Sequence, residues 1–131
     1  MTDFTAILQK YFEDMFKNGR EVTLRFRITE GATVNLEKEY DGKELNEIID
    51  EWLKELCVQS RFNVSDMTEN QMFVEQARIP LLNESLKPMD TREFMQIFRK
   101  RLKKPPYNLN SKVYLRGLGE AWIIIGGNEE P

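Results

Sequence analysis

The sequence contains no histidine and only one cysteine, Cys57. Without histidine the chain lacks the most frequent general base and transition-metal ligand, so Ser-His-Asp and Cys-His catalysis within one chain are excluded. A single cysteine forms neither an internal disulfide nor a cysteine-rich zinc site, which favours a cytoplasmic protein. No apolar run approaches the roughly 18 residues of a membrane span, and residues 1–10 lack the basic-then-apolar pattern of a signal peptide. We therefore expect no membrane partner, no cofactor and no metal.

The remaining composition is that of a globular protein. The chain has 131 residues, of which 40% are hydrophobic and 31% charged, and its net charge is −3. This length lies within the usual range of one domain, so residues 1–131 are expected to form a single domain.

The first half shows clear periodicity. Apolar residues at helical spacing predict a helix over residues 3–18. Alternation then predicts a strand over residues 22–28, followed by a second strand over residues 32–36. A three-residue loop at 29–31 would place Ile28 opposite Ala32 and keep one face of this hairpin apolar. Residues 41–44 have the acidic pattern of a helix start, and a helical stripe continues from there to Cys57.

The second half is read from caps and breakers. Asp66 and Glu69 have capping-box spacing, so the middle, residues 58–88, is expected to be a short helix plus irregular loop. Asp90 caps a further helix, which ends before Pro105. Residues 112–125 read as a hairpin turning at residues 117–119, and its last strand, residues 121–125, is unbroken apolar, as in a central strand covered on both faces.

These elements combine into an α+β fold. The expected order is helix–β-hairpin–helix, an irregular or short-helical middle, then helix–β-hairpin. Because short connections favour neighbouring antiparallel strands, we expect one antiparallel sheet with the helices packed on it.

Charge is distributed unevenly along the chain. Residues 1–90 hold 18 acidic and 11 basic residues, whereas residues 91–131 hold 4 acidic and 8 basic ones. One helix has an acidic face that would bind a basic groove on a partner protein; it comprises Glu44, Glu47, Asp50, Glu51 and Glu55. The plainer interpretations are a solvated face, or pairing with the protein's own basic helix.

The basic residues suggest a second surface. A helix end and the following hairpin would bind phosphates or nucleic acid, through Arg92, Arg99, Lys100, Lys103, Lys104, Tyr107, Lys112 and Arg116. The plainer interpretation is a solvated helix end whose cations interact with the helix dipole. Arg101 falls inside the apolar arc of its helix, so it must reach out along the surface or find an acidic partner.

Other single residues favour structural roles. Cys57 extends an apolar stripe, which indicates a buried thiol. Trp52 and Trp122 lie within apolar patterns, which assigns them to the core, whereas Tyr107 follows two prolines and is expected on the surface.

No nucleophile–base pair, metal cluster or cofactor motif is present, so we predict a protein that is not an enzyme. Small size and opposed charged faces favour a binding protein that inhibits or adapts a nucleic-acid-handling complex, as anti-CRISPR and other phage or mobile-element accessory proteins do. The alternative is direct nucleic-acid binding through the basic helix and the hairpin. A third arrangement is a homodimer in which the acidic helix of one subunit meets the basic helix of the other.

Overall fold

The computed structural model describes residues 18–83, 85–117 and 119–126. The elements in chain order are β1 (Arg20–Ile28), β2 (Glu39–Tyr40), β3 (Lys43–Glu44), α2 (Leu45–Leu56), the 3-10 turn η1 (Val58–Ser60), β4 (Asn63–Met67), β5 (Gln71–Ile79), α3 (Thr91–Lys103), β6 (Ser111–Leu115) and β7 (Glu120–Ile125). The helix expected over residues 3–18 lies almost entirely outside the described residues.

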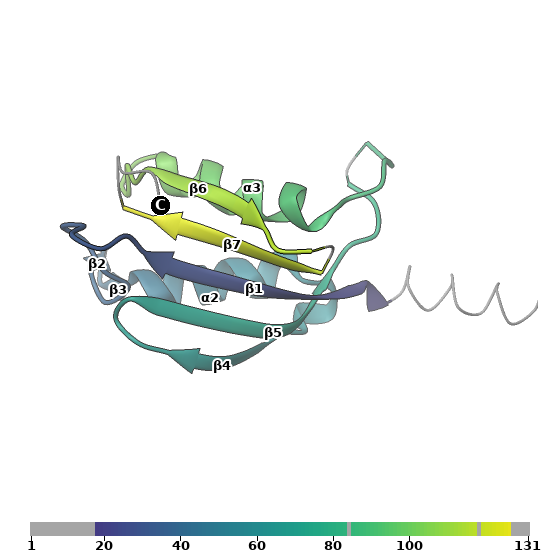
Figure 1. Cartoon of the computed structure of the whole chain (residues 1–131), viewed down its shortest axis with the longest axis horizontal. Coiled ribbons are helices and arrows are strands. Elements are labelled where there is room, and N and C mark those ends of the chain that lie inside the picture. Colours follow the sequence, from purple (N-terminus) through teal and green to yellow (C-terminus); the bar gives the residue numbers. More distant parts are fainter. Residues whose placement is uncertain (1–17, 84, 118, 127–131) are drawn as a thin grey trace, which may run out of the picture.

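Five strands form one sheet in the order β4-β5-β1-β7-β6, and β2 and β3 form a small separate ribbon. Strands β1 and β7 are parallel, while the other neighbours in the sheet are antiparallel. Both helices lie on the same side of this sheet (Figure 1). The sheet therefore has one face covered by helices and one face without them.

The expected antiparallel sheet is wrong, because its two central strands run parallel. The direction follows from the crossover through α3. This connection carries the chain to the outer edge, so that β6 runs parallel to β5 with β1 and β7 between them. The tight turn after β6 then returns β7 into the gap beside β1, where its direction matches that of β1.

The expected hairpin over residues 22–36 is also wrong. The turn at its tip exists, since the Ala32 N–H donates to the Thr29 carbonyl at 3.1 Å. However, both edges of β1 are already hydrogen-bonded, one to β5 and the other to β7. No edge remains for residues 32–36, and the Leu36 N–H instead donates to the Glu69 carbonyl at 2.8 Å.

The middle of the chain is a β-hairpin, β4–β5, rather than a short helix and loop. The spacing of Asp66 and Glu69 belongs to its turn, where the Thr68 N–H donates to the Gln71 carbonyl at 2.8 Å. A bulge near Gln76, whose φ is +55°, shifts the register of β5 against β1. The shift interrupts the alternation of buried residues along β5, which obscured the strand in the sequence.

Helices α2 and α3 and the hairpin β6–β7 are present close to where the sequence places them. The cap of α3 is the expected one, because the Glu93 N–H donates to Asp90 Oδ1 at 2.7 Å. Helix α2 begins later than expected, because the Asp41-Gly42 segment turns the ribbon β2–β3. Glu44 is therefore its N-cap, and the Glu44 N–H donates to Glu47 Oε1 at 3.2 Å.

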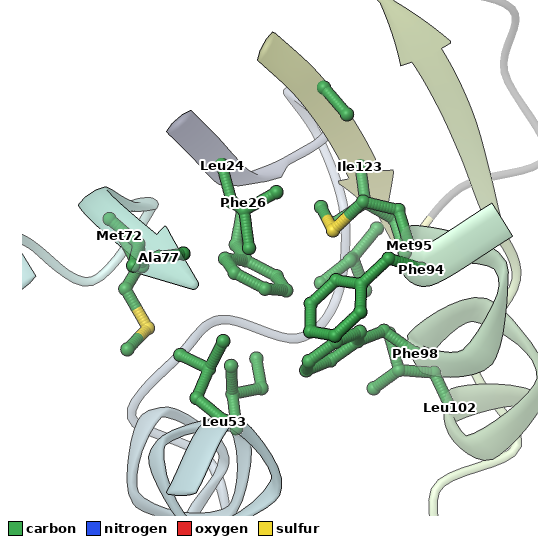
Figure 2. Packing of buried hydrophobic residues seen from close by; sticks show 14 of the residues in the cluster. Leu24, Phe26, Leu53, Met72, Ala77, Phe94, Met95, Phe98, Leu102 and Ile123 are labelled. Carbon is green, nitrogen blue, oxygen red and sulfur yellow. The ribbon is translucent and has the colours of Figure 1, made fainter. Parts of the chain in front are cut away.

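The core lies between the sheet and the two helices. Side chains of β1, β5 and β7 point toward Leu53 of α2 and toward Phe94 and Phe98 of α3 (Figure 2). Phe98 is fully buried and meets Phe26 of β1 edge to face, with ring centroids 5.3 Å apart. Since alternate residues of each strand enter this core, the residues between them occupy the other face of the sheet.

Candidate functional site

The five carboxylates of the predicted acidic face all have partners within the chain. Lys43 Nζ lies 2.7 Å from Glu51 Oε2, and Lys54 Nζ lies 3.2 Å from Asp50 Oδ2. Glu47 binds the backbone at the start of α2, as described above. The remaining two are Glu44, which accepts from the Asn46 side chain at 3.0 Å, and Glu55. Three of the five carboxylates are thus paired with cations of the protein itself, and the other two accept hydrogen bonds.

Glu55 joins α2 to the basic helix. Arg101 donates to both of its oxygens, from Nη1 at 3.1 Å and from Nη2 at 2.7 Å. Its guanidinium carbon also lies 5.6 Å from the centroid of Trp52. The hydrogen bonds from Arg101 hold the pKa of Glu55 below its usual value. This contact supplies the acidic partner that Arg101 was expected to need.

The other basic residues of α3 and of its C-terminal cap have no such acidic partner among the described residues. The basic stripe, defined as Arg92, Arg99, Lys100, Lys103 and Lys104, follows the outer side of the helix and its end. Arg99 donates to Gln96 of its own helix. Within the described part of the chain, none of the five forms an ion pair. None of the carboxylates among the described residues therefore neutralises these five cations.

Tyr107 does not project freely from the surface. It is partly buried and meets two aromatic rings edge to face, those of Tyr40 at 5.0 Å and Trp52 at 5.5 Å. Burial raises the pKa of Tyr40, and the neighbouring Tyr107 raises it further. Tyr107 therefore packs at the edge of the core, against Tyr40 and Trp52. Its role is structural, unlike that proposed for the basic stripe.

Lys112 and Arg116 lie on the face of the sheet that the helices leave uncovered. Pairing with β7 places Lys112 opposite Ile124 and Tyr114 opposite Trp122. Pairing of β7 with β1 then places Trp122 beside Arg25. We call this surface the open face; its members on these strands are Glu21, Thr23, Arg25, Arg27, Lys112, Tyr114, Arg116, Glu120, Trp122 and Ile124.

The centre of the open face is a set of stacked rings and guanidinium groups. The guanidinium carbon of Arg25 lies 4.0 Å from the ring centroid of Phe73 and 5.1 Å from that of Trp122. Arg116 approaches Trp122 to 5.0 Å. Glu120 Oε2 accepts from the Trp122 indole N–H at 2.6 Å and lies 3.2 Å from Arg25 Nε. Cation–π contacts and one carboxylate thus fix the planes of these groups.

The sequence pattern does not reveal this cluster. Trp122 is not a core residue but a partly exposed one, because β7 has only one covered face. Its uninterrupted apolar run hid the alternation between buried Ile123 and outward Trp122. Arg25 and Phe73 are far apart in the sequence, and only the pairing of β1 with β5 brings them together.

No catalytic arrangement emerges elsewhere in the described residues. Cys57 is buried, and this burial raises the pKa of its thiol to about 12, which leaves it unreactive at neutral pH. The described ranges contain no cluster of three metal-ligating side chains and no helix long and apolar enough to cross a membrane. A hollow lies beside the turn at residues 29–35, and the residues that line it include charged, neutral polar and apolar ones.

These features define a two-layer α+β protein with a mixed sheet, one open face and a basic stripe on α3 that forms no ion pair among the described residues. Residues 20–126 match a family described as Domain of unknown function (DUF6175), and the chain belongs to this family. Neither the curated proteins nor the solved structures contain a match.

Proposed function

We propose that this protein is a non-enzymatic binding protein that binds nucleic acid through the basic stripe of α3 and the hairpin β6–β7. The observation that carries the proposal is the contrast between the two charged helices. The carboxylates of α2 are engaged by the chain's own cations and backbone, whereas the basic stripe has no ion pair among the described residues. One cysteine is consistent with action in the cytoplasm.

A phosphate backbone suits such a surface. Each phosphate that a lysine or arginine neutralises releases condensed counterions, so affinity falls with salt in proportion to the number of contacts. If all five cations of the stripe contact a duplex, the slope of log K against log salt is about −4 to −5. The net charge of −3 does not oppose this, because the cations are gathered on one side.

The other hypothesis is a protein partner at the acidic face of α2, as for an inhibitor from a phage or mobile element. It stays a prediction, and the structure favours it less, because a basic partner would have to displace Lys43, Lys54 and Arg101. Its signature is distinct: no affinity for nucleic acid, and binding to a protein that is lost when Glu47 and Glu51 are reversed in charge.

The test is fluorescence anisotropy with labelled single-stranded DNA, single-stranded RNA and duplex DNA over a range of salt concentrations. The variant R99Q/K100Q/K103Q removes three charges of the stripe. The matched control K38Q/R61Q/K87Q removes three exposed charges elsewhere. We expect the stripe variant to lose about tenfold or more in affinity and to reduce the salt slope by about 2 to 3.

Two results would overturn the proposal. One is no binding by the wild-type protein at about 50 mM salt, up to the roughly 10⁻⁴ M range of non-specific interactions. The other is an equal loss in the stripe variant and the control, which would show that only net charge matters. Circular dichroism of both variants verifies that they remain folded.

A further inference from the structure

The open face of the sheet carries aromatic rings in addition to cations. We infer that it binds single-stranded nucleic acid by stacking bases on Trp122, Tyr114 and Phe73. This inference rests on the proposed function and names the form of nucleic acid that the same hairpin recognises. Strand pairing aligns these groups in one row across the sheet, in the order Tyr114, Trp122, Arg25 and Phe73.

The row has the dimensions of a short stretch of bases. Adjacent strands lie about 4.8 Å apart, so the three steps from β6 to β5 span about 14 Å. Aromatic rings and arginine planes are the surfaces on which proteins stack unpaired bases. The open face presents both kinds of surface, since Arg25 lies between the rings of Trp122 and Phe73.

The groups of the row are held in place before any ligand binds. Glu120 accepts from the Trp122 indole N–H at 2.6 Å and lies 3.2 Å from Arg25 Nε. Trp122 and the Arg25 side chain are only partly exposed, the latter to 33%. A platform that is already ordered loses little conformational entropy when a base stacks on it.

Charge selects the ligand. The part of the open face formed by β6, β7 and β1 carries four cations, Arg25, Arg27, Lys112 and Arg116, against the two carboxylates of Glu21 and Glu120. An apolar peptide or helix would remove these charged side chains from water, which is costly. A polyanion with flat apolar bases complements both the charges and the rings.

A single strand fits better than a duplex. In a duplex the base faces are stacked on one another and are not available to the rings, whereas a single strand can splay its bases onto them. The phosphates of the same strand would lie along Lys112 and Arg116 on β6, at the edge of the sheet. The edge strand thereby connects base stacking with backbone contacts.

The test uses the fact that the chain has two tryptophans. In W52F the remaining Trp122 reports on the open face, and we expect oligo(dT) of about 12 nucleotides to quench its fluorescence. In W122F the remaining Trp52, at the rim of the core, should not respond. We further expect W122A to weaken oligo(dT) binding about tenfold or more, while duplex binding changes little. The control L115A removes an exposed apolar side chain from the same hairpin but from the other face.

The outcomes separate this inference from the proposed function. Binding of oligo(dT) that depends on the basic stripe but leaves Trp122 unquenched, with W122A equal to L115A, overturns stacking and retains nucleic-acid binding. Absence of any nucleic-acid binding by the wild-type protein overturns both the stacking inference and the proposed function. A Trp122 that is already shielded from acrylamide in the free protein and indifferent to oligo(dT) overturns stacking and assigns the face to another segment of the chain or a second copy.

Discussion

Gly19 offers a sharp test of the close packing at the entry to the central strand. Its φ is +78°, and a Cβ built on it would lie 2.6 Å from the Ile79 carbonyl oxygen and 2.9 Å from Val58 Cγ2. Ile79 is the last residue of β5 and is paired with Arg20 of β1. A shift of its carbonyl away from the new Cβ would therefore disturb this strand pairing. Alanine at this position therefore has two costs, one conformational and one steric.

Gly31 separates these two costs. Its φ is +83°, yet no atom lies within 4 Å of its would-be Cβ. The left-handed conformation costs about 1–2 kcal/mol for an L-residue, and both variants share this cost. Only G19A adds overpacking against backbone, about 1–3 kcal/mol. We expect G31A to lower the free energy of unfolding by about 1–2 kcal/mol and G19A by about 2–5 kcal/mol.

Urea denaturation followed by far-ultraviolet circular dichroism measures both values, provided that the slope m is unchanged between variants. A domain of this size has about 5–15 kcal/mol of stability in total, so G19A remains measurable. Equal destabilisation in G19A and G31A would refute the close approach of Gly19 to β5 and η1. The effect would then be one of backbone conformation alone.

Two further predictions concern titratable groups. The thiol of Cys57 should react with a thiol reagent only on unfolding, because raising its pKa from 9.0 to about 12 reduces the thiolate about a thousandfold. Since the folded state keeps the proton that the unfolded state loses, stability should fall more steeply from about pH 9 upward in wild type than in C57A, in which Tyr40 with its raised pKa still contributes. A double-mutant cycle on Glu55 and Arg101 should give a coupling of about 0.2–1 kcal/mol, because Glu55 is 59% exposed. The lowered pKa of Glu55 means that this coupling is present above its unfolded pKa and is lost as pH falls through the folded one; a coupling that persists at pH 2 would contradict the pairing.

The local elements of this fold could be predicted because their determinants are local. Asp90 and its hydrogen bond to the Glu93 backbone mark the start of α3, and the apolar stripe of Phe94 and Phe98 determines which side is buried. The β6–β7 hairpin is similarly local, since one short turn joins its strands. Even the need of Arg101 for an acidic partner follows from its angular position on the helix, although Glu55 as that partner does not.

The errors occur where pairing is long-range. The alternation of β1 does not indicate which strands pair with it. The nearest segment in the sequence, residues 32–36, does not pair with β1, because β5 and β7 occupy both of its edges. The bulge at Gln76 removed the regular alternation from β5, so that a capping-box spacing suggested a helix instead. In both cases a pattern within a few residues suggested the wrong structure, whereas hydrogen bonds between distant segments determine the observed one.

The open face shows the same limit for function. Thr23, Arg25 and Arg27 read in the sequence only as the solvated side of a strand, and Trp122 reads as core. The strand pairing shows instead that they belong to one surface. Arg25 lies between Trp122, 97 positions away in the sequence, and Phe73, 48 positions away. A sequence pattern can identify each residue's face, but only the strand order decides which residues share it. A surface assembled from three strands in this way is therefore found by testing Trp122 and Arg25 together, because the basic run of the sequence lies on α3, which covers the opposite face of the sheet.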